Sequence, residues 1–172
     1  MKWNTKDRLA LEVVGYYARQ EFADKHIIHT QAVANYTRLI AVGEGMDENQ
    51  SALQEIAAWF HDIGCPESYK KFGNTLPVNQ QREGYILTQE WLKDEADLSS
   101  KEKEWLADVV ATHHQFKSAN ELGFLPLFEA DLIVNLLDGY YSEGQEQHLY
   151  DKLMQTKTGK ELFEKIFSPL HK

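Results

Sequence analysis

Residues 57–69 read AAWFHDIGCPESY, an apolar run that leads directly into His61 and Asp62. Gly64 and Pro66 follow, so we predict that a helix ends just after this polar pair. A hydrophobic side chain would pack better at such a place, so the pair needs a physical reason. One reason is purely structural, because the helix dipole favours a histidine at a helix C-terminus and a carboxylate can accept a hydrogen bond from a neighbouring ring. Residues elsewhere in the chain must decide between a structural pair and a functional one.

Apolar residues recur through the rest of the chain with the period of about 3.6 that is typical of helices. Valine, isoleucine and threonine do not alternate with polar residues, so strands are absent or trivial. We expect an all-α fold of about 7–8 helices, packed as a compact irregular bundle without a persistent heptad. One or two helices are expected between residues 144 and 167, and the others at 5–22, 26–44, 48–62, 79–94, 99–114 and 124–138.

Local signals mark the ends of some of these helices. Thr5 is predicted to be the N-cap of the first helix, and Ser99 with Glu102 three residues later fits a capping box. Residues 64–77 contain two Pro and two Gly, and we predict that they form the longest irregular segment.

The composition is that of an ordinary globular protein. With 172 residues, of which 42% are hydrophobic and 26% charged, we expect residues 1–172 to form a single domain. The formal net charge of −9 argues against duplex nucleic acid as a partner, because phosphate neutralisation needs clustered Lys and Arg. The single cysteine, Cys65, excludes an internal disulfide and fits a reducing compartment. Without a recognisable signal peptide or membrane-spanning run, we expect a cytoplasmic protein that does not bind membranes.

Four places on the predicted helices put a side chain that can bind metal on an apolar face. They are His29, with His26 one turn earlier; the pair His61 and Asp62; the pair His113 and His114; and Asp131. Each has a structural alternative, most simply a hydrogen-bonded histidine in the core. Asp131 is the hardest to explain in that way, because its helix is so apolar that an ionised carboxylate there needs a partner. A divalent cation explains all four places at once, since two imidazoles and two carboxylates bind and neutralise it.

The order and local context of these residues resemble the HD superfamily of metal-dependent phosphohydrolases, in its HDIG variant. The family pattern is H…HD…D on an all-α scaffold, and the resemblance covers about residues 25–140. The segments that carry it are HTQAVANYTRLIAVGEGMDE, AAWFHDIGCPES and FEADLIVNLLD. The resemblance implies a metal bound by four ligands: His29, His61, Asp62 and Asp131.

The paired histidines His113 and His114 resemble those of HD proteins that bind a second metal, such as the HD-GYP phosphodiesterases. Those enzymes carry an HPxxG motif on the helix that NQQREGYILTQEWL resembles. Here Gln80 stands four residues before Gly84 in place of the motif's histidine, and the GYP segment is absent. The resemblance therefore leaves a second metal and the cleavage of a cyclic dinucleotide undecided.

The mixed nitrogen and oxygen ligand set suits Mn²⁺, Fe²⁺, Co²⁺ or Ni²⁺; Zn²⁺ more often takes fewer protein ligands, and Mg²⁺ avoids imidazole. Water bound to such a metal has its pKa lowered from 15.7 toward about 7. We expect Asp62 to bind the metal and to orient this water for attack on phosphorus. His113 or His114 is expected to protonate the leaving oxygen, to contribute to a second metal site or to bind a phosphate. Glu83 is the next candidate for the proton donor, with an exposed helix carboxylate as the alternative.

The expected substrate is a small phosphate ester, most simply a nucleotide. The cations predicted to bind its phosphate, each with a solvated surface position as the alternative, are Lys70, Lys71, Arg82 and Lys117. Two other functions stay open: a non-catalytic nucleotide-sensing or protein-binding module on the same scaffold, and oxidative chemistry at a di-iron site. Trp3, Trp91 and Trp105, if exposed, permit a homodimer without showing one.

Overall fold

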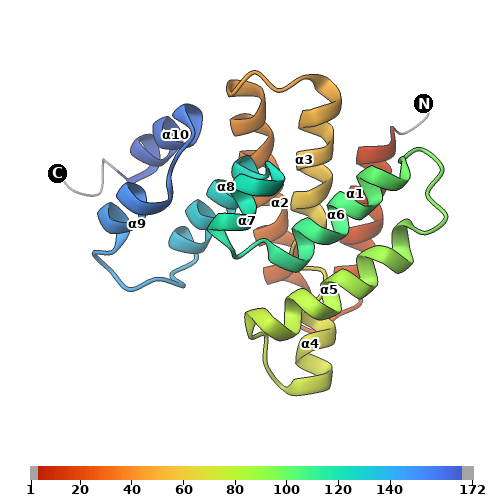
Figure 1. The fold of residues 1–172 in the computed structure, drawn as a ribbon. Coiled ribbons are helices and arrows are strands. Elements are labelled where there is room, and N and C mark those ends of the chain that lie inside the picture. Colours follow the sequence, from red (N-terminus) through yellow and green to blue (C-terminus); the bar gives the residue numbers. More distant parts are fainter. Residues whose placement is uncertain (1–3, 168–172) are drawn as a thin grey trace.

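The computed structural model describes residues 4–167, which form ten helices and no strand (Figure 1). The predicted all-α fold is therefore confirmed. The helices are α1 (Thr5–Tyr17), α2 (Ala23–Gly43), α3 (Glu48–Phe60), α4 (Cys65–Phe72), α5 (Pro77–Leu92), α6 (Ser100–Thr112), α7 (Phe116–Leu122), α8 (Leu125–Leu137), α9 (Glu146–Leu153) and α10 (Lys157–Phe167).

Two short helices raise the number above the predicted seven or eight. The prediction that residues 64–77 are irregular is wrong, because α4 occupies the first half of them. Pro66 lies in the first turn of α4, where its missing N–H breaks no helical hydrogen bond, and Gly73 ends the helix with φ of +68°. In the same way α7 ends at Gly123, with φ of +74°. Proline and glycine mark helix ends here, rather than a long loop.

The helix caps agree with the sequence in one case and differ in another. The prediction of Thr5 as N-cap is wrong, because Asn4 is extended and its side chain accepts the backbone N–H three residues later at 2.9 Å. The helix that follows ends at Tyr17 and not at residue 22. The capping box of α6 is confirmed: Ser99 Oγ accepts from the N–H of Glu102, and the Glu102 carboxylate accepts from the N–H of Ser99.

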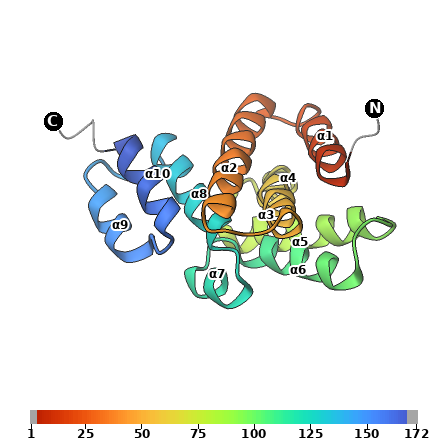
Figure 2. The same cartoon turned by 90° about the horizontal axis from the view of Figure 1, so that it is seen from above.

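The main hydrophobic core lies among α1, α2, α3, α5, α6 and α8. Its largest fully buried side chains include Tyr17, Phe60, Leu106 and Phe124, and burying one apolar side chain of this size stabilises the fold by about 1.5–3 kcal/mol. Helix α2 packs along both α3 and α8, while α5 packs along α6 (Figures 1 and 2). This packing gathers the first turns of α2, the ends of α3 and α6, and the middle of α8 in one region.

A smaller core joins α8 to the last two helices, which lie together beside it in Figure 2. Ile133 of α8 and Phe163 of α10 are both buried in it. The carboxylate of Glu129 on α8 accepts three hydrogen bonds at the start of α10, from the N–H groups of Gln155 (2.5 Å) and Thr156 (2.8 Å) and from the Thr156 hydroxyl (2.5 Å). Helix α8 therefore contributes to both cores.

Helices α4 and α5 approach each other closely at two glycines. A Cβ atom on Gly64 would lie 2.1 Å from the backbone oxygen of Gln80 and 2.3 Å from the backbone nitrogen of Gly84. No side chain fits between these backbones, so glycine at position 64 allows α5 to pass directly beside the segment that carries His61 and Asp62.

The tryptophans do not form an exposed patch on the described part of the chain. Trp3 lies outside the described residues. Trp91 packs against the main core, with its ring edge-to-face to Tyr16 at 5.5 Å, and Trp105 is also partly buried and donates its N–H to the backbone oxygen of Leu122 at 2.8 Å. The homodimer stays a prediction. None of the helices within residues 4–167 has the length and apolar character needed to cross a membrane.

Candidate metal centre

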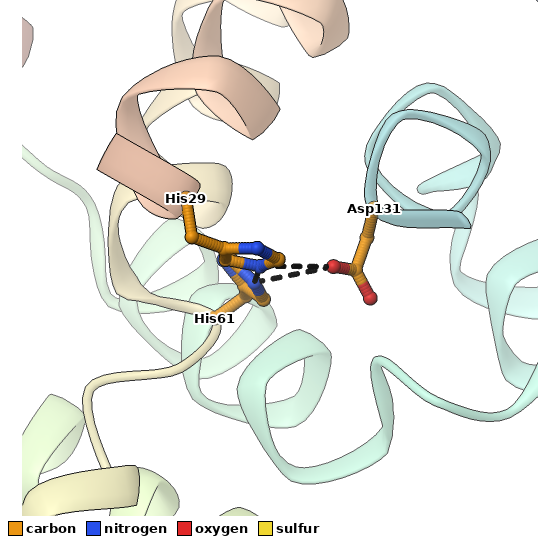
Figure 3. A group of neighbouring side chains, drawn as sticks. All are labelled: His29, His61 and Asp131. Carbon is orange, nitrogen blue, oxygen red and sulfur yellow. Dashed lines mark hydrogen bonds and ion pairs between the residues drawn. The ribbon is translucent and has the colours of Figure 1, made fainter. Parts of the chain in front are cut away.

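All four residues predicted as metal ligands come together, although they lie on three separate parts of the chain. His29 is on α2, His61 is the C-cap of α3 with Asp62 next to it, and Asp131 is in the middle of α8 (Figure 3). The Nε2 atom of His29 lies 3.3 Å from Nε2 of His61 and 3.3 Å from Oδ1 of Asp131. Asp62 Oδ2 lies 3.7 Å from the first of these nitrogens and 3.5 Å from the second. The four side chains therefore converge on one point.

Hydrogen bonds on the far side of each ring decide which nitrogen faces this point. The Nδ1 atoms of His61 and His113 each lie within 2.9 Å of the backbone oxygen three residues earlier, and Nδ1 of His29 lies 2.8 Å from Oδ2 of Asp138. A carbonyl or carboxylate oxygen can only accept, so each Nδ1 carries the hydrogen and donates it. Each Nε2 is therefore left with a lone pair directed at the carboxylates, which is the arrangement that a metal requires.

Several polar atoms at the centre have no hydrogen-bond partner among the described residues. They are Oδ1 of Asp62, Oδ1 of Asp131 and Nε2 of His113, all of them buried. A buried acceptor without a donor costs about 1–3 kcal/mol, and two imidazole lone pairs 3.3 Å apart repel each other unless a cation lies between them. The residues therefore fit a divalent metal, which would bind both the lone pairs and the carboxylate oxygens.

The histidines and carboxylates of the centre shift one another's pKa values in the metal-free protein. Burial lowers the pKa of His29, but the neighbouring carboxylates of Asp131 and Asp62 outweigh this and raise that pKa to about 9. Burial also raises the pKa of Asp62, while the charge of His61 and the neighbouring ring of His113 outweigh it and hold that pKa well below its usual range. The carboxylates stay ionised, and without a metal a proton is held among the rings instead.

A second group of possible ligands adjoins the first. Suitable atoms of Asp62, His113 and His114 lie within 4.8 Å of one another, and His113 Nε2 is 3.4 Å from Asp62 Oδ1. Gln80 lies directly beside them: its Oε1 accepts from the Cys65 thiol at 2.5 Å, and its Nε2 is 2.5 Å from His114 Nε2. The amide N–H thus occupies the lone pair of His114 that a second metal would need. The sequence leaves the number of metals undecided. Gln80, which takes the place of the histidine of the HPxxG motif, does lie beside the second group of possible ligands.

The four cations predicted to bind phosphate all form ion pairs with glutamates. Lys70 pairs with Glu67 at 2.9 Å, and Lys117 with a glutamate one turn later on α7 at 3.6 Å. Lys71 and Arg82 share the carboxylate of Glu83, at 2.5 and 3.1 Å. Among the described interactions, none joins these cations to the four proposed metal ligands. Their role in substrate binding stays a prediction.

Glu83 is not the exposed helix carboxylate that its position on α5 suggested. Only 3% of it is exposed, and Lys71 of α4 pairs with its carboxylate. The hydrogen bond from Lys71 lowers its pKa, so the carboxylate is ionised and a poor proton donor. Its two ion pairs give Glu83 a structural role between α4 and α5.

The sequence did not single out Asp138, which contacts His29 directly. The signal that could have found it is its spacing, because Asp138 follows Asp131 by seven residues and therefore lies on the same face of the helix, two turns later. His26, which the sequence did single out, stacks on the buried ring of Tyr17 at 5.1 Å. It belongs to neither of the two groups of possible ligands.

Comparison with known families agrees with this geometry. A family model for the HD domain matches residues 27–156, which is most of the chain and includes every side chain of both ligand groups. No curated protein and no solved structure matches the chain.

Proposed function

Because the chain belongs to the HD domain family, a superfamily of metal-dependent phosphohydrolases, we propose that it hydrolyses a phosphate ester with the help of a divalent metal. The substrate class that we propose is a nucleotide or a similarly small phosphometabolite. One observation carries the proposal: the lone pairs of His29 and His61 and the carboxylates of Asp62 and Asp131 meet at one point, and some of these buried atoms have no other partner in the described residues.

The ligand set supports Mn²⁺, Fe²⁺, Co²⁺, Ni²⁺ or Zn²⁺ in preference to Mg²⁺, which takes oxygen ligands almost exclusively. When bound, such an ion supplies a hydroxide at neutral pH and draws charge from a phosphoryl oxygen. Asp62 has the position to orient the attacking water, because one of its oxygens faces the ligand nitrogens while the other, Oδ1, faces His113.

We assign stabilisation of the leaving oxygen to His114 rather than to His113. The ring of His113 is almost completely buried and its Nδ1 hydrogen is held by a backbone oxygen. His114 is exposed as a residue and so can reach a substrate. Its Nε2 accepts from Gln80, and burial together with the charge of His113 lowers its pKa to about 4, so the ring is neutral and offers its Nδ1 hydrogen as a hydrogen-bond donor to the charge that develops on the leaving oxygen. A single donor to a developing negative charge typically contributes about 10²- to 10³-fold to kcat, so we expect His114→Ala to lower kcat by that factor.

The phosphate contacts that we propose are Lys70 and Lys117. Each belongs to an exposed ion pair on its own helix, and such pairs are worth about 0–1 kcal/mol. Either ammonium can therefore exchange its glutamate for a phosphate at little cost. Lys71 and Arg82 are less available, because leaving Glu83 would strand a buried carboxylate.

The test is to measure the metal content of the purified protein and to assay it against a panel of phosphomonoesters, phosphodiesters and nucleotides. We expect a bound transition metal and release of phosphate or of a nucleoside monophosphate. Asp62→Ala and treatment with a chelator are expected to abolish turnover, whereas Asp151→Ala, on the exposed face of α9, retains it. Turnover that survives both chelation and Asp62→Ala would refute the proposal. Binding of a nucleotide without turnover by the metal-loaded protein would instead favour a sensing module on the same scaffold.

A further inference from the structure

Asp138 is held rigidly at the end of α8. It is the C-cap of that helix, and its backbone N–H donates to the oxygen of Val134 at 2.8 Å. The next residue, Gly139, has φ of +76°, and the N–H of Tyr140 returns to the oxygen of Asn135 at 3.0 Å. This turn closes the helix and leaves the Asp138 side chain free to reach α2, where Oδ2 lies 2.8 Å from Nδ1 of His29.

Asp138 supplies the Nδ1 acceptor that His29, unlike His61 and His113, does not find in its own helix. His61 and His113 stand at helix C-termini, where the last backbone oxygens have no partner within the helix and can accept from Nδ1. His29 lies within α2, which runs from Ala23 to Gly43, and the oxygens of the preceding turn are used by the helix itself. Its ring therefore depends on an acceptor from another part of the chain.

We propose that Asp138 is a positioning residue for the metal centre: its carboxylate fixes the hydrogen of His29 on Nδ1 and so directs the Nε2 lone pair to the ion. This inference rests on the proposed metal-dependent function. An acceptor behind a histidine ligand orients the ring and makes it a stronger ligand, and its loss typically costs about 10- to 100-fold in metal affinity. Helix α8 would then supply one ligand directly, Asp131, and hold a second in place from its end.

The experiment compares Zn²⁺ and Mn²⁺ dissociation constants, measured by competition with a chromophoric chelator. The proteins are the wild type, Asp138→Ala, Asp138→Asn and the control Asp151→Asn, an exposed carboxylate on α9 whose partner, Gln147, lies on the same helix. We expect Asp138→Ala to bind metal about 10- to 100-fold more weakly. Asp138→Asn keeps an oxygen that accepts from Nδ1 and is expected to lie between the alanine variant and the wild type. Asp151→Asn is expected to match the wild type.

A second measurement needs no variant. In the diamagnetic zinc form, the Nδ1 proton of His29 should give an NMR signal that exchanges slowly with water, in contrast to the ring protons of the exposed His148. Exchange as fast as that of His148 would overturn the inference, as would unchanged metal affinity in a folded Asp138→Ala protein. Both results leave the metal centre itself intact. A wild-type protein that binds neither ion would overturn the proposed function, and the inference with it.

Discussion

Replacing Gly64 by alanine tests whether the close crossing of α4 and α5 is required by the fold. The backbone at Gly64 has φ of −79° and ψ of −13°, a conformation that alanine adopts readily, so any cost comes from space alone. The added Cβ atom would lie 2.1 Å from the backbone oxygen of Gln80, whereas ordinary contacts begin at 3.4 Å. Helix α5 must therefore retreat by on the order of 1 Å.

An overlap of this kind in a well-packed region costs about 1–3 kcal/mol, and the upper half of that range is expected because the obstacle is backbone and cannot rotate away. In a chain of this length each kcal/mol lowers Tm by about 2–4 °C, so we expect Gly64→Ala to lower Tm by about 4–12 °C. Since Gln80 is displaced as well, its contacts with Cys65 and His114 should weaken.

The assay is thermal unfolding of the metal-free proteins, followed by calorimetry or circular dichroism. The matched control is Gly15→Ala in the last turn of α1, where the new Cβ would meet only a guanidinium nitrogen of Arg19 at 3.7 Å. That substitution is expected to stabilise the protein by about 0.5–1 kcal/mol, because alanine is the better helix former. A Gly64→Ala protein with a Tm at or above that of the wild type would refute the steric reasoning.

Three further predictions concern ionised groups. Metal affinity is expected to rise with pH up to about 9, because the pKa of His29 is raised to about 9 in the metal-free protein and the ion must displace that proton. Calorimetric titrations that give the same affinity at every pH from 6.5 to 9 would contradict this. By the same linkage, the stability that protonated His29 gives the metal-free protein is complete below about pH 6.5 and is lost as the pH rises through 9, which urea unfolding will measure. Glu129→Gln puts an amide NH₂ among three donors at the start of α10, so we expect it to lower the free energy of unfolding, measured in urea, by about 1–3 kcal/mol. The control Glu121→Gln, at an exposed position of α7, should leave that free energy unchanged.

The sequence singled out the candidate metal ligands because each one contradicts its surroundings. Asp131 stands in an apolar helix and His29 on an apolar stripe, and such positions carry information that does not depend on knowing the packing. The convergence of the four ligands followed from the need for one partner to explain them all.

Asp138 carried no such contradiction. An aspartate next to a glycine at the end of a helix is an ordinary cap, and its partner His29 is 109 residues away in the chain. The environments of the cations were hidden for the same reason: the sequence does not reveal that Lys71 and Arg82 meet on one buried carboxylate, because Glu83 has the spacing of a surface residue. Long-range pairs between polar side chains depend on how helices cross, and periodicity does not contain that information.

Helix α4 shows a different limit. Pro66 and Gly73 occur in loops and at helix ends alike, so their presence within residues 64–77 indicated a break without indicating where it lies. The packing of α4 against α5 decides that the segment between Pro66 and Gly73 is helical.

Because α8 is built into both cores, we expect metal binding at the candidate centre and docking of the C-terminal pair α9 and α10 to be thermodynamically linked. An ion that binds Asp131 restrains the same helix whose Glu129 anchors the start of α10. Amide hydrogens of α10 should therefore exchange more slowly in the metal-loaded protein, and by reciprocity anything that undocks α10 reduces affinity for the ion. By this reasoning the last two helices would contribute to the affinity for an ion that none of their residues binds.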